Sequence, residues 1–292
     1  MRKIKISISI LLCCLFINVQ GQDFQTINYL KNDVDSLDLN FFRPANTKTK
    51  SPLVIFVHGG GFSGGSRNAG TDFGTYLAKN GFACASITYT LYMKDKDFGC
   101  NGILSEKIKA IRFGATDLWA ATNYIIQHAD ELNIDTSRIF IAGASAGAET
   151  VLHAAYWNRQ QMSLFKTGLS PTFRYAGIIS GAGAIMDLNL ITAQNAIPTL
   201  MFHGDADKLV PYATAAHHFC PCNSSGWLML FGSKSIYDHM LNLGGSAQLI
   251  TFLEGNHDYS SYYIRKDTQV VVDFLNKVLK GKRLKKHILQ NT

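Results

Sequence analysis

A serine between two glycines is the clearest candidate for chemistry in this chain. Ser145 lies in Gly143-Ala144-Ser145-Ala146-Gly147, after the β-branched and aromatic run 138–142 and before 148–157, which has no glycine or proline. These flanks predict a strand, a sharp turn and a helix. Ser145 would then lie at a helix N-terminus, where free N–H groups favour a developing negative charge. The spacing indicates a nucleophile, although the pentapeptide alone also fits an ordinary turn.

A serine hydroxyl becomes a good nucleophile when a histidine takes its proton and a carboxylate orients that histidine. The apolar run 199–202 leads to Asp205 and Asp207, and the apolar run 249–253 leads to His257. We predict Asp207 as the acid, because it lies deeper in its loop and precedes 209–211, which can anchor that loop. Asp205 is expected to bind turn amides. His257 is the predicted base, the alternative being a surface loop histidine.

A glycine-rich loop supplies the fourth part of the predicted site. His58-Gly59-Gly60-Gly61-Phe62 follows the apolar run 53–57. Backbone N–H groups of Gly60 and Gly61, together with that of Ala146, are predicted to bind the oxyanion of a tetrahedral intermediate. A phosphate-binding loop is the alternative for such a stretch, but neither a Gly-Lys-Ser/Thr ending nor a G-x-G-x-x-G pattern is present.

Strands and helices alternate along the chain, which predicts an α/β fold with a mainly parallel central sheet and helices on both faces. Reactive loops of such sheets lie at the carboxyl ends of the strands, and each motif above follows a predicted strand. Predicted strands cover 24–29, 37–42, 53–57, 82–89, 138–142, 175–180, 199–202 and 248–253; predicted helices cover 74–79, 107–132, 148–157 and 270–279.

Composition agrees with one large domain. The chain has 292 residues, of which 47% are hydrophobic and 17% charged, enough for a sizeable core. We expect a single domain over 22–292 with a small insertion at about 212–232. The formal charge is +7, but nine of the 28 basic residues lie in 1–21 and 277–286, which leaves 19 against 21 acidic residues. This near-neutral body argues against a nucleic-acid partner. The basic end is expected to be the solvated end of the last helix.

The N-terminus predicts export. Residues 1–5 are basic and 6–19 are mostly apolar, which is typical of a signal peptide of residues 1–21 and too short for a comfortable membrane span. The mature protein is expected to be secreted or periplasmic, without stable membrane insertion; a lipoprotein is less favoured. Export permits disulfides, and the pairing stays open among four cysteines: Cys84, Cys100, Cys220 and Cys222.

The insertion has two interpretations. It is either a surface excursion over the core or a small cap over a substrate pocket. In the second case Tyr212 and Trp227, together with Phe62, are candidate pocket walls. His217, His218, Cys220 and Cys222 are too closely spaced for the usual separated pairs of zinc ligands.

The four motifs, in this order, resemble the carboxylesterase/lipase type of α/β-hydrolase with an HGGG oxyanion loop. The chain is similar to exported bacterial esterases that include acetyl-xylan and feruloyl esterases, over about residues 37–279. The resemblance implies a serine ester hydrolase with Ser145, His257 and Asp207 as the triad, no metal or organic cofactor, and a small-molecule or polysaccharide ester as substrate. A serine peptidase of the same fold, a short-chain lipase and a non-catalytic binding protein are the alternatives.

Overall fold

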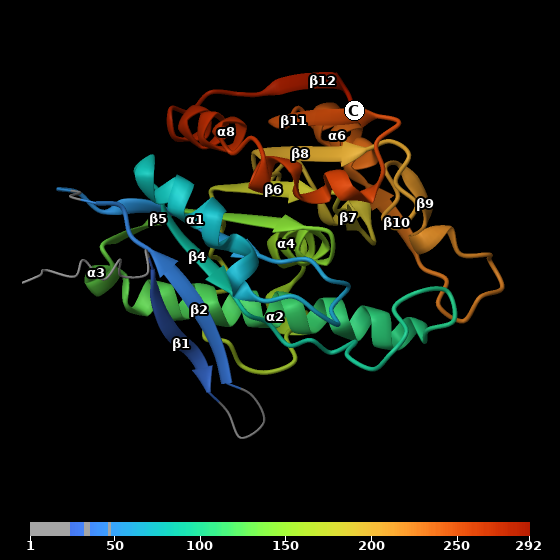
Figure 1. Ribbon diagram of the computed structural model, residues 1–292, viewed down its shortest axis with the longest axis horizontal. Helices are drawn as coiled ribbons and strands as arrows, with labels where there is room; N and C mark the ends of the chain where they lie inside the picture. The colour runs from blue at the N-terminus through green and yellow to red at the C-terminus, as the bar shows by residue number, and fades with distance from the viewer. Residues whose placement is uncertain (1–23, 32–35, 46–47) are drawn as a thin grey trace, which may run out of the picture.

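A twisted central sheet organises the molecule, which the computed structural model describes over residues 24–31, 36–45 and 48–292. The predicted signal segment 1–21 lies outside the described residues. Nine strands from these ranges form the sheet in the order β1-β2-β4-β3-β5-β6-β8-β11-β12, from the lower left to the top of Figure 1. They are β1 (Gln25–Lys31), β2 (Ser36–Phe42), β3 (Ser51–Val57), β4 (Ala83–Ile87), β5 (Ile134–Ala144), β6 (Gly177–Gly181), β8 (Thr199–Gly204), β11 (Ala247–Leu253) and β12 (Lys285–Asn291).

The pairing confirms the predicted mainly parallel sheet. β1 pairs with β2, and β2 with β4, in antiparallel fashion, whereas the other neighbours are parallel. Val57 at the end of β3 is in register with Gly143 near the end of β5. His203 in β8 is likewise in register with Thr251 in β11. The loops that follow these strands therefore start at the same edge of the sheet.

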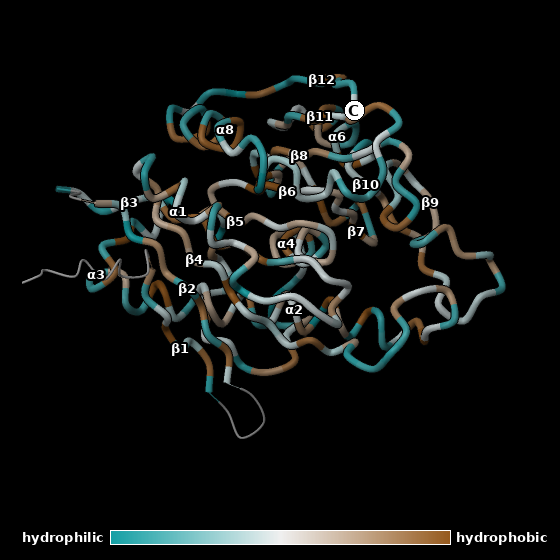
Figure 2. The backbone as a smooth tube through the Cα atoms, in the orientation of Figure 1, coloured by the Kyte–Doolittle hydropathy of each residue, from teal (hydrophilic) through white to brown (hydrophobic). Residues whose placement is uncertain are grey.

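Helices cover both faces, because successive side chains of each strand point to opposite sides. One face packs against α2 (Leu104–Gln127), α4 (Ala146–Tyr156) and α6 (Ser233–Asn242), and the other against α1 (Thr71–Lys79), α7 (Tyr262–Arg265) and α8 (Gln269–Leu279). Short helical segments connect these elements: η1 (Arg67–Gly70), α3 (Ala129–Leu132), α5 (Arg159–Met162), η2 (Leu188–Leu190), η3 (His217–Phe219) and η4 (His257–Ser261). Figure 2 shows hydrophilic residues on many of the loops around the sheet.

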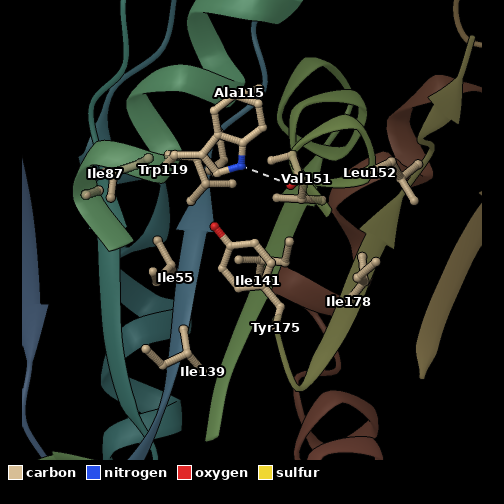
Figure 3. Close-up of a cluster of buried hydrophobic side chains, with 14 of the residues drawn as sticks. Ile55, Ile87, Ala115, Trp119, Ile139, Ile141, Val151, Leu152, Tyr175 and Ile178 are labelled. Atoms are coloured by element: carbon tan, nitrogen blue, oxygen red, sulfur yellow. Dashed lines mark hydrogen bonds between the residues drawn. The ribbon is translucent and has the colours of Figure 1, made fainter. Parts of the chain in front are cut away.

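The core below α2 and α4 fixes the helix that follows Ser145. Figure 3 shows Trp119 of α2 between the two helices and the sheet, above Ile55 and Ile141. The indole Nε1–H of Trp119 donates a 2.9 Å hydrogen bond to the carbonyl oxygen of Ala154 in α4. Trp119 thus buries its ring while its polar group is satisfied, and it joins the two helices.

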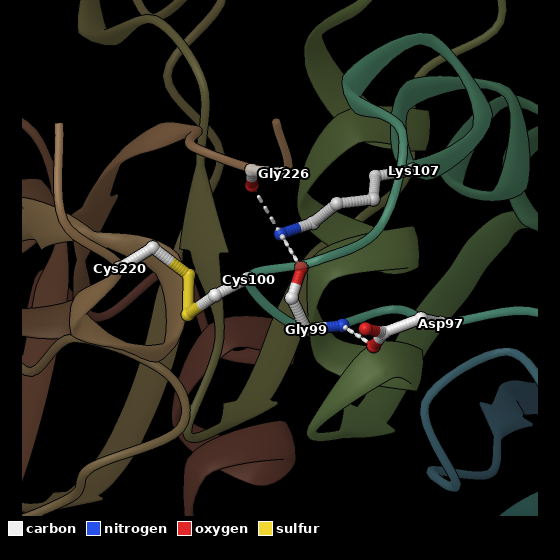
Figure 4. The surroundings of a disulfide bond; sticks show 6 residues. All are labelled: Asp97, Gly99, Cys100, Lys107, Cys220 and Gly226. Carbon is white, nitrogen blue, oxygen red and sulfur yellow. Dashed lines mark hydrogen bonds between the residues drawn. A yellow bond between two sulfur atoms is a disulfide. The ribbon is translucent and has the colours of Figure 1, made fainter. Parts of the chain in front are cut away.

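The segment predicted as an insertion contains a second small sheet. β9 (Thr214–Ala216) and β10 (Met229–Gly232) lie antiparallel, and β10 also pairs with β7 (Ala184–Ile185). A disulfide joins Cys100 to Cys220, one of the pairings that the sequence left open, while Cys84 and Cys222 are free thiols. Figure 4 shows this disulfide beside Lys107, whose Nζ donates to the carbonyl oxygens of Gly226, at 2.7 Å, and Gly99, at 3.4 Å.

Two predictions about secondary structure need correction. The predicted helix 107–132 is divided, because α2 ends at Gln127 and α3 starts at Ala129 after a non-helical His128. The basic end does not extend the last helix: α8 ends at Leu279, and β12 pairs in parallel with β11. This strand covers what would otherwise be an unpaired edge of β11. None of the helices in the described ranges is long and apolar enough to cross a membrane.

We predict that the disulfide contributes substantially to stability, because Cys100 and Cys220 close a loop with a sequence separation of 120 residues. Replacing both with serine is expected to lower the free energy of unfolding by about 3 kcal/mol, measured by urea denaturation without reductant. Cys222→Ser, which removes a neighbouring free thiol, is the matched control. Equal midpoints for the double variant and the control would contradict the prediction.

Candidate active site

Ser145 occupies a sharp turn between β5 and α4. Its backbone has φ 54° and ψ −126°, in the left-handed half of conformational space. The turn is possible because neighbouring glycines carry no side chain: a Cβ on Gly143 would lie 2.2 Å from the carbonyl oxygen of Gly147, and one on Gly147 would lie 2.1 Å from that of Val57. The Ser145 N–H donates to the Gly181 carbonyl at 2.8 Å, which fixes the turn against β6.

The structure brings together Ser145, His257 and Asp207, from three separate loops. His257 Nε2 lies 2.8 Å from Ser145 Oγ, and His257 Nδ1 lies 2.7 Å from Asp207 Oδ2. Because a carboxylate only accepts hydrogen bonds, Nδ1 carries the proton and Nε2 is free to accept the serine proton. This Ser–His–Asp chain has the arrangement that base-assisted nucleophilic attack requires.

Asp207 is held as an anion by several donors. Its Oδ1 accepts hydrogen bonds from the N–H groups of Leu209, at 2.8 Å, and Val210, at 3.1 Å. Its Oδ2 also lies 3.2 Å from His203 Nε2. Burial alone would raise the pKa of Asp207, but the hydrogen bonds from His203 and His257 outweigh it and hold the pKa well below its ordinary value.

Asp205 binds a backbone amide rather than the histidine, as expected from the sequence. Its Oδ1 accepts a 2.6 Å hydrogen bond from the Glu254 N–H, which ties the loop after β8 to the loop after β11.

His203 was assigned no role from sequence. It is fully buried, and its Nε2 faces the Asp207 carboxylate and the Val210 carbonyl, 3.1 Å away. The only sequence signal for this contact was that His203 precedes Asp207 by four residues.

Gly60, Gly61 and Ala146 present backbone N–H groups to the same cavity. Gly60 has φ 109° and Gly61 has φ 60°, conformations that glycine adopts easily. A Cβ on Gly60 would lie 2.3 Å from the Gly64 carbonyl. Within the described ranges no acceptor takes the N–H of Gly60, Gly61 or Ala146. His58 supports the loop: its Nδ1 donates to the Gly59 carbonyl at 2.7 Å, and its ring stacks on Tyr89.

A cavity of about 540 Å³ opens in front of Ser145. Gly60, Gly61 and Ala146 are among the residues that line it. The structure does not bring the three expected wall residues to this cavity. Phe62 is fully buried against Tyr89 and Phe98, because its ring fills the core. The Tyr212 hydroxyl bonds Thr251 at 2.6 Å, and Trp227 packs half-buried outside the lining.

Different residues line the cavity instead, from the two loops that the disulfide joins. Phe98 comes from the loop before α2, and His217 and His218 come from the 212–232 segment. Glu149, one helical turn after Ser145, also lines it. Glu149 was not predicted from the sequence, where its only signal is that it is the one acidic residue of α4. Within the described ranges no three metal-ligating side chains gather in one place.

Burial raises the pKa of Glu149 to about 8, against an opposing effect of Lys107 and with a further increase from Asp207. The side chain is 1% exposed. Burial also lowers the pKa of the neighbouring His217 well below its ordinary value, which leaves this imidazole neutral. Glu149 is therefore largely protonated at neutral pH, in contrast to Asp207.

The fold and this geometry define the class of protein. A mainly parallel sheet, with the serine on a strand-to-helix turn and the aspartate and histidine after later strands, is the α/β-hydrolase arrangement. The chain belongs to the BD-FAE family, whose model matches residues 39–196. That match includes the glycine loop and Ser145 and ends before Asp207 and His257.

Named relatives agree with this class. A fumonisin B1 esterase of Sphingopyxis macrogoltabida is 29% identical over 40% of this chain and 22% of its own length. A bifunctional acetylxylan esterase/xylanase of Neocallimastix patriciarum is 24% identical over 64% of this chain and 24% of its own length. The match therefore spans about a quarter of these curated relatives or less. A thermophilic esterase of Thermogutta terrifontis, solved with propionate bound, has a TM-score of 0.64 at 16% identity, over 89% of this chain and 94% of that chain. This last likeness concerns the fold.

We predict a pH-dependent stabilisation by Glu149→Gln. A carboxyl whose pKa is raised on folding binds its proton more tightly in the folded state, so the wild-type free energy of unfolding falls as pH rises from about 4.5 to about 8. Glutamine removes this loss. Lys107, Asp207, His217 and Tyr89, which face Glu149, are present in both proteins.

Urea denaturation of both proteins between about pH 5 and about pH 9 measures the effect. The variant is expected to gain stability relative to wild type by a few kcal/mol across this range. A difference that stays constant with pH would show that Glu149 is ionised throughout, contrary to the prediction.

Proposed function

We propose that this protein is an exported serine carboxylic-ester hydrolase. The observation that carries the proposal is the Ser145–His257–Asp207 chain, with hydrogen bonds of 2.8 and 2.7 Å, beside backbone N–H groups that have no acceptor among the described residues. Membership of the BD-FAE family and the likeness to named esterases support the same reaction.

In the proposed reaction, His257 Nε2 takes the Ser145 proton as Oγ attacks the ester carbonyl. Asp207 keeps the imidazole in the required tautomer and stabilises its positive charge. The oxyanion of the tetrahedral intermediate accepts hydrogen bonds from Gly60, Gly61 and Ala146, and one such donor lowers the barrier by roughly 3 kcal/mol. His257 then protonates the leaving alcohol, and a water that His257 activates hydrolyses the acyl-enzyme.

For the substrate we propose small acyl esters of plant polysaccharides, such as acetyl or feruloyl esters. The named acetylxylan activity of one relative and the predicted signal peptide support this choice. A cavity of about 540 Å³ accommodates a small acyl group with part of a sugar. A panel of acyl chain lengths and sugar esters tests it: hydrolysis restricted to long acyl chains would identify a lipase instead.

Replacing the nucleophile gives the first test of the reaction. Ser145→Ala is expected to lower kcat/KM for p-nitrophenyl acetate by at least about 10³-fold, because a triad without its serine retains only weak catalysis. Ser137→Ala, at the opposite end of β5, is the matched control and should hydrolyse at the wild-type rate. Equal hydrolysis by Ser145→Ala and wild type would refute the proposal.

The two aspartates after β8 give a second test. Asp207→Asn is expected to lower kcat by about 10³- to 10⁴-fold, since an amide cannot hold the required tautomer of His257. Asp205→Asn should keep most of the activity, because this residue bonds a backbone N–H rather than His257. The assignment of the acid would be wrong if the Asp205 variant, and not the Asp207 variant, lost turnover.

A further inference from the structure

Glu149 lies in the cavity but takes no part in the proposed reaction. It follows Ser145, the residue that caps the N-terminus of α4, by four residues, and its backbone N–H donates to the Ser145 carbonyl at 3.0 Å. Glu149 is among the residues that line the cavity, and its side chain is almost completely buried.

The Glu149 carboxyl has no hydrogen-bond partner among the described residues, at either oxygen. His217 Nε2 lies 3.4 Å from Oε1, outside hydrogen-bond geometry. His217 Nδ1 is also buried without a hydrogen-bond partner in the described ranges. Asp207, in contrast, accepts two backbone hydrogen bonds. Buried polar groups in native proteins nearly always have a hydrogen-bond partner, so the unpartnered Glu149 and His217 need an explanation.

The surrounding structure holds Glu149 and His217 in place. The disulfide anchors Cys220 near His217, and the His217 N–H donates to the Leu228 carbonyl at 2.8 Å. The Phe98 ring packs edge-on against the His217 ring, with centroids 5.0 Å apart. The two side chains are therefore arranged in advance of any ligand, as specific recognition requires.

Charge selects the kind of group that fits. Lys107, whose positive charge acts on the Glu149 carboxyl, donates to two carbonyl oxygens and forms no hydrogen bond with Glu149. With a protonated Glu149 and a neutral His217, the pair offers hydrogen-bond donors and acceptors without net charge. An ammonium group would need an ionised Glu149, and a carboxylate would bring a buried negative charge that this neutral pair does not compensate. A hydroxyl, which both donates and accepts, satisfies the pair.

We propose that Glu149 and His217 form a subsite that binds a substrate hydroxyl close to the scissile ester bond. The inference rests on the proposed ester hydrolysis. Because Ser145 and Glu149 line the same cavity and lie one turn apart at the start of α4, a hydroxyl bound there would be within a few bonds of the ester. Two sources share this chemistry: the alcohol part, as in a partly acylated sugar or polyol, and the acyl part, as in a hydroxy acid.

Two matched pairs of small esters distinguish the sources. Hydroxyethyl acetate against methoxyethyl acetate tests the alcohol side, and methyl glycolate against methyl methoxyacetate tests the acyl side. In one pair, wild type is expected to favour the hydroxyl ester in kcat/KM by roughly tenfold, the effect of one hydrogen bond in a buried site.

Variants connect the preference to the subsite. Glu149→Leu should reduce the hydroxyl-to-methoxy ratio to about one, whereas Glu149→Gln, whose amide still donates and accepts, should keep part of it. Glu131→Gln, an exposed glutamate on α3, is the matched control and should leave the ratio unchanged. If Glu149→Leu does not fold, His217→Phe replaces it, with a lower ratio expected.

The outcomes separate the two proposals. If wild type does not hydrolyse p-nitrophenyl acetate, the proposed ester-hydrolase function is refuted. Hydrolysis without a hydroxyl preference in either pair would overturn the subsite, as would a preference that survives in Glu149→Leu or His217→Phe. Because a general loss of stability lowers both rates of a pair together, the ratio reports recognition rather than folding.

Discussion

The close contact of β3, β5 and α4 at the Ser145 turn is the constraint on which the site depends. Gly143 and Gly147 let backbone meet backbone there, and a Cβ at either position would lie within 2.2 Å of a carbonyl oxygen. The contact places the turn beside the glycine loop that follows β3. The positive φ of Ser145 costs about 1–3 kcal/mol, which the packing of α4 against α2 and the sheet offsets.

The loops after β8 and β11 complete the site through polar contacts rather than packing. Asp205 bonds the backbone of the second loop, while Asp207 bonds its histidine. Two aspartates separated by one residue thus have different roles, since Asp205 holds the two loops together and Asp207 orients the histidine of the second loop. His203 adds a donor beneath Asp207, so the carboxylate is buried without being left unsatisfied.

The sequence allowed prediction of the features that depend on local patterns. Buried strands, the turn at Ser145 and the loop glycines follow from residue type and spacing, and the predicted parallel sheet is confirmed. Apart from the triad, whose three motifs each follow a predicted strand, long-range contacts could not be predicted from the sequence. Nothing near Tyr212 indicated that its hydroxyl would bond Thr251, nor did the basic tail indicate a strand beside β11. Glu149 resembled a helix surface residue until His217, far along the chain, was placed against it.

Two buried carboxyl groups near one cavity must differ in charge, because two anions there would repel each other. The structure determines which one ionises through its donors. Asp207 receives two backbone N–H groups and faces two histidines, whereas Glu149 receives no hydrogen bond from the described residues. The pKa values of the two groups are consequently pushed in opposite directions. The negative charge is thereby concentrated beside His257, where an imidazolium would form, and the rest of the cavity is left to neutral hydrogen bonding.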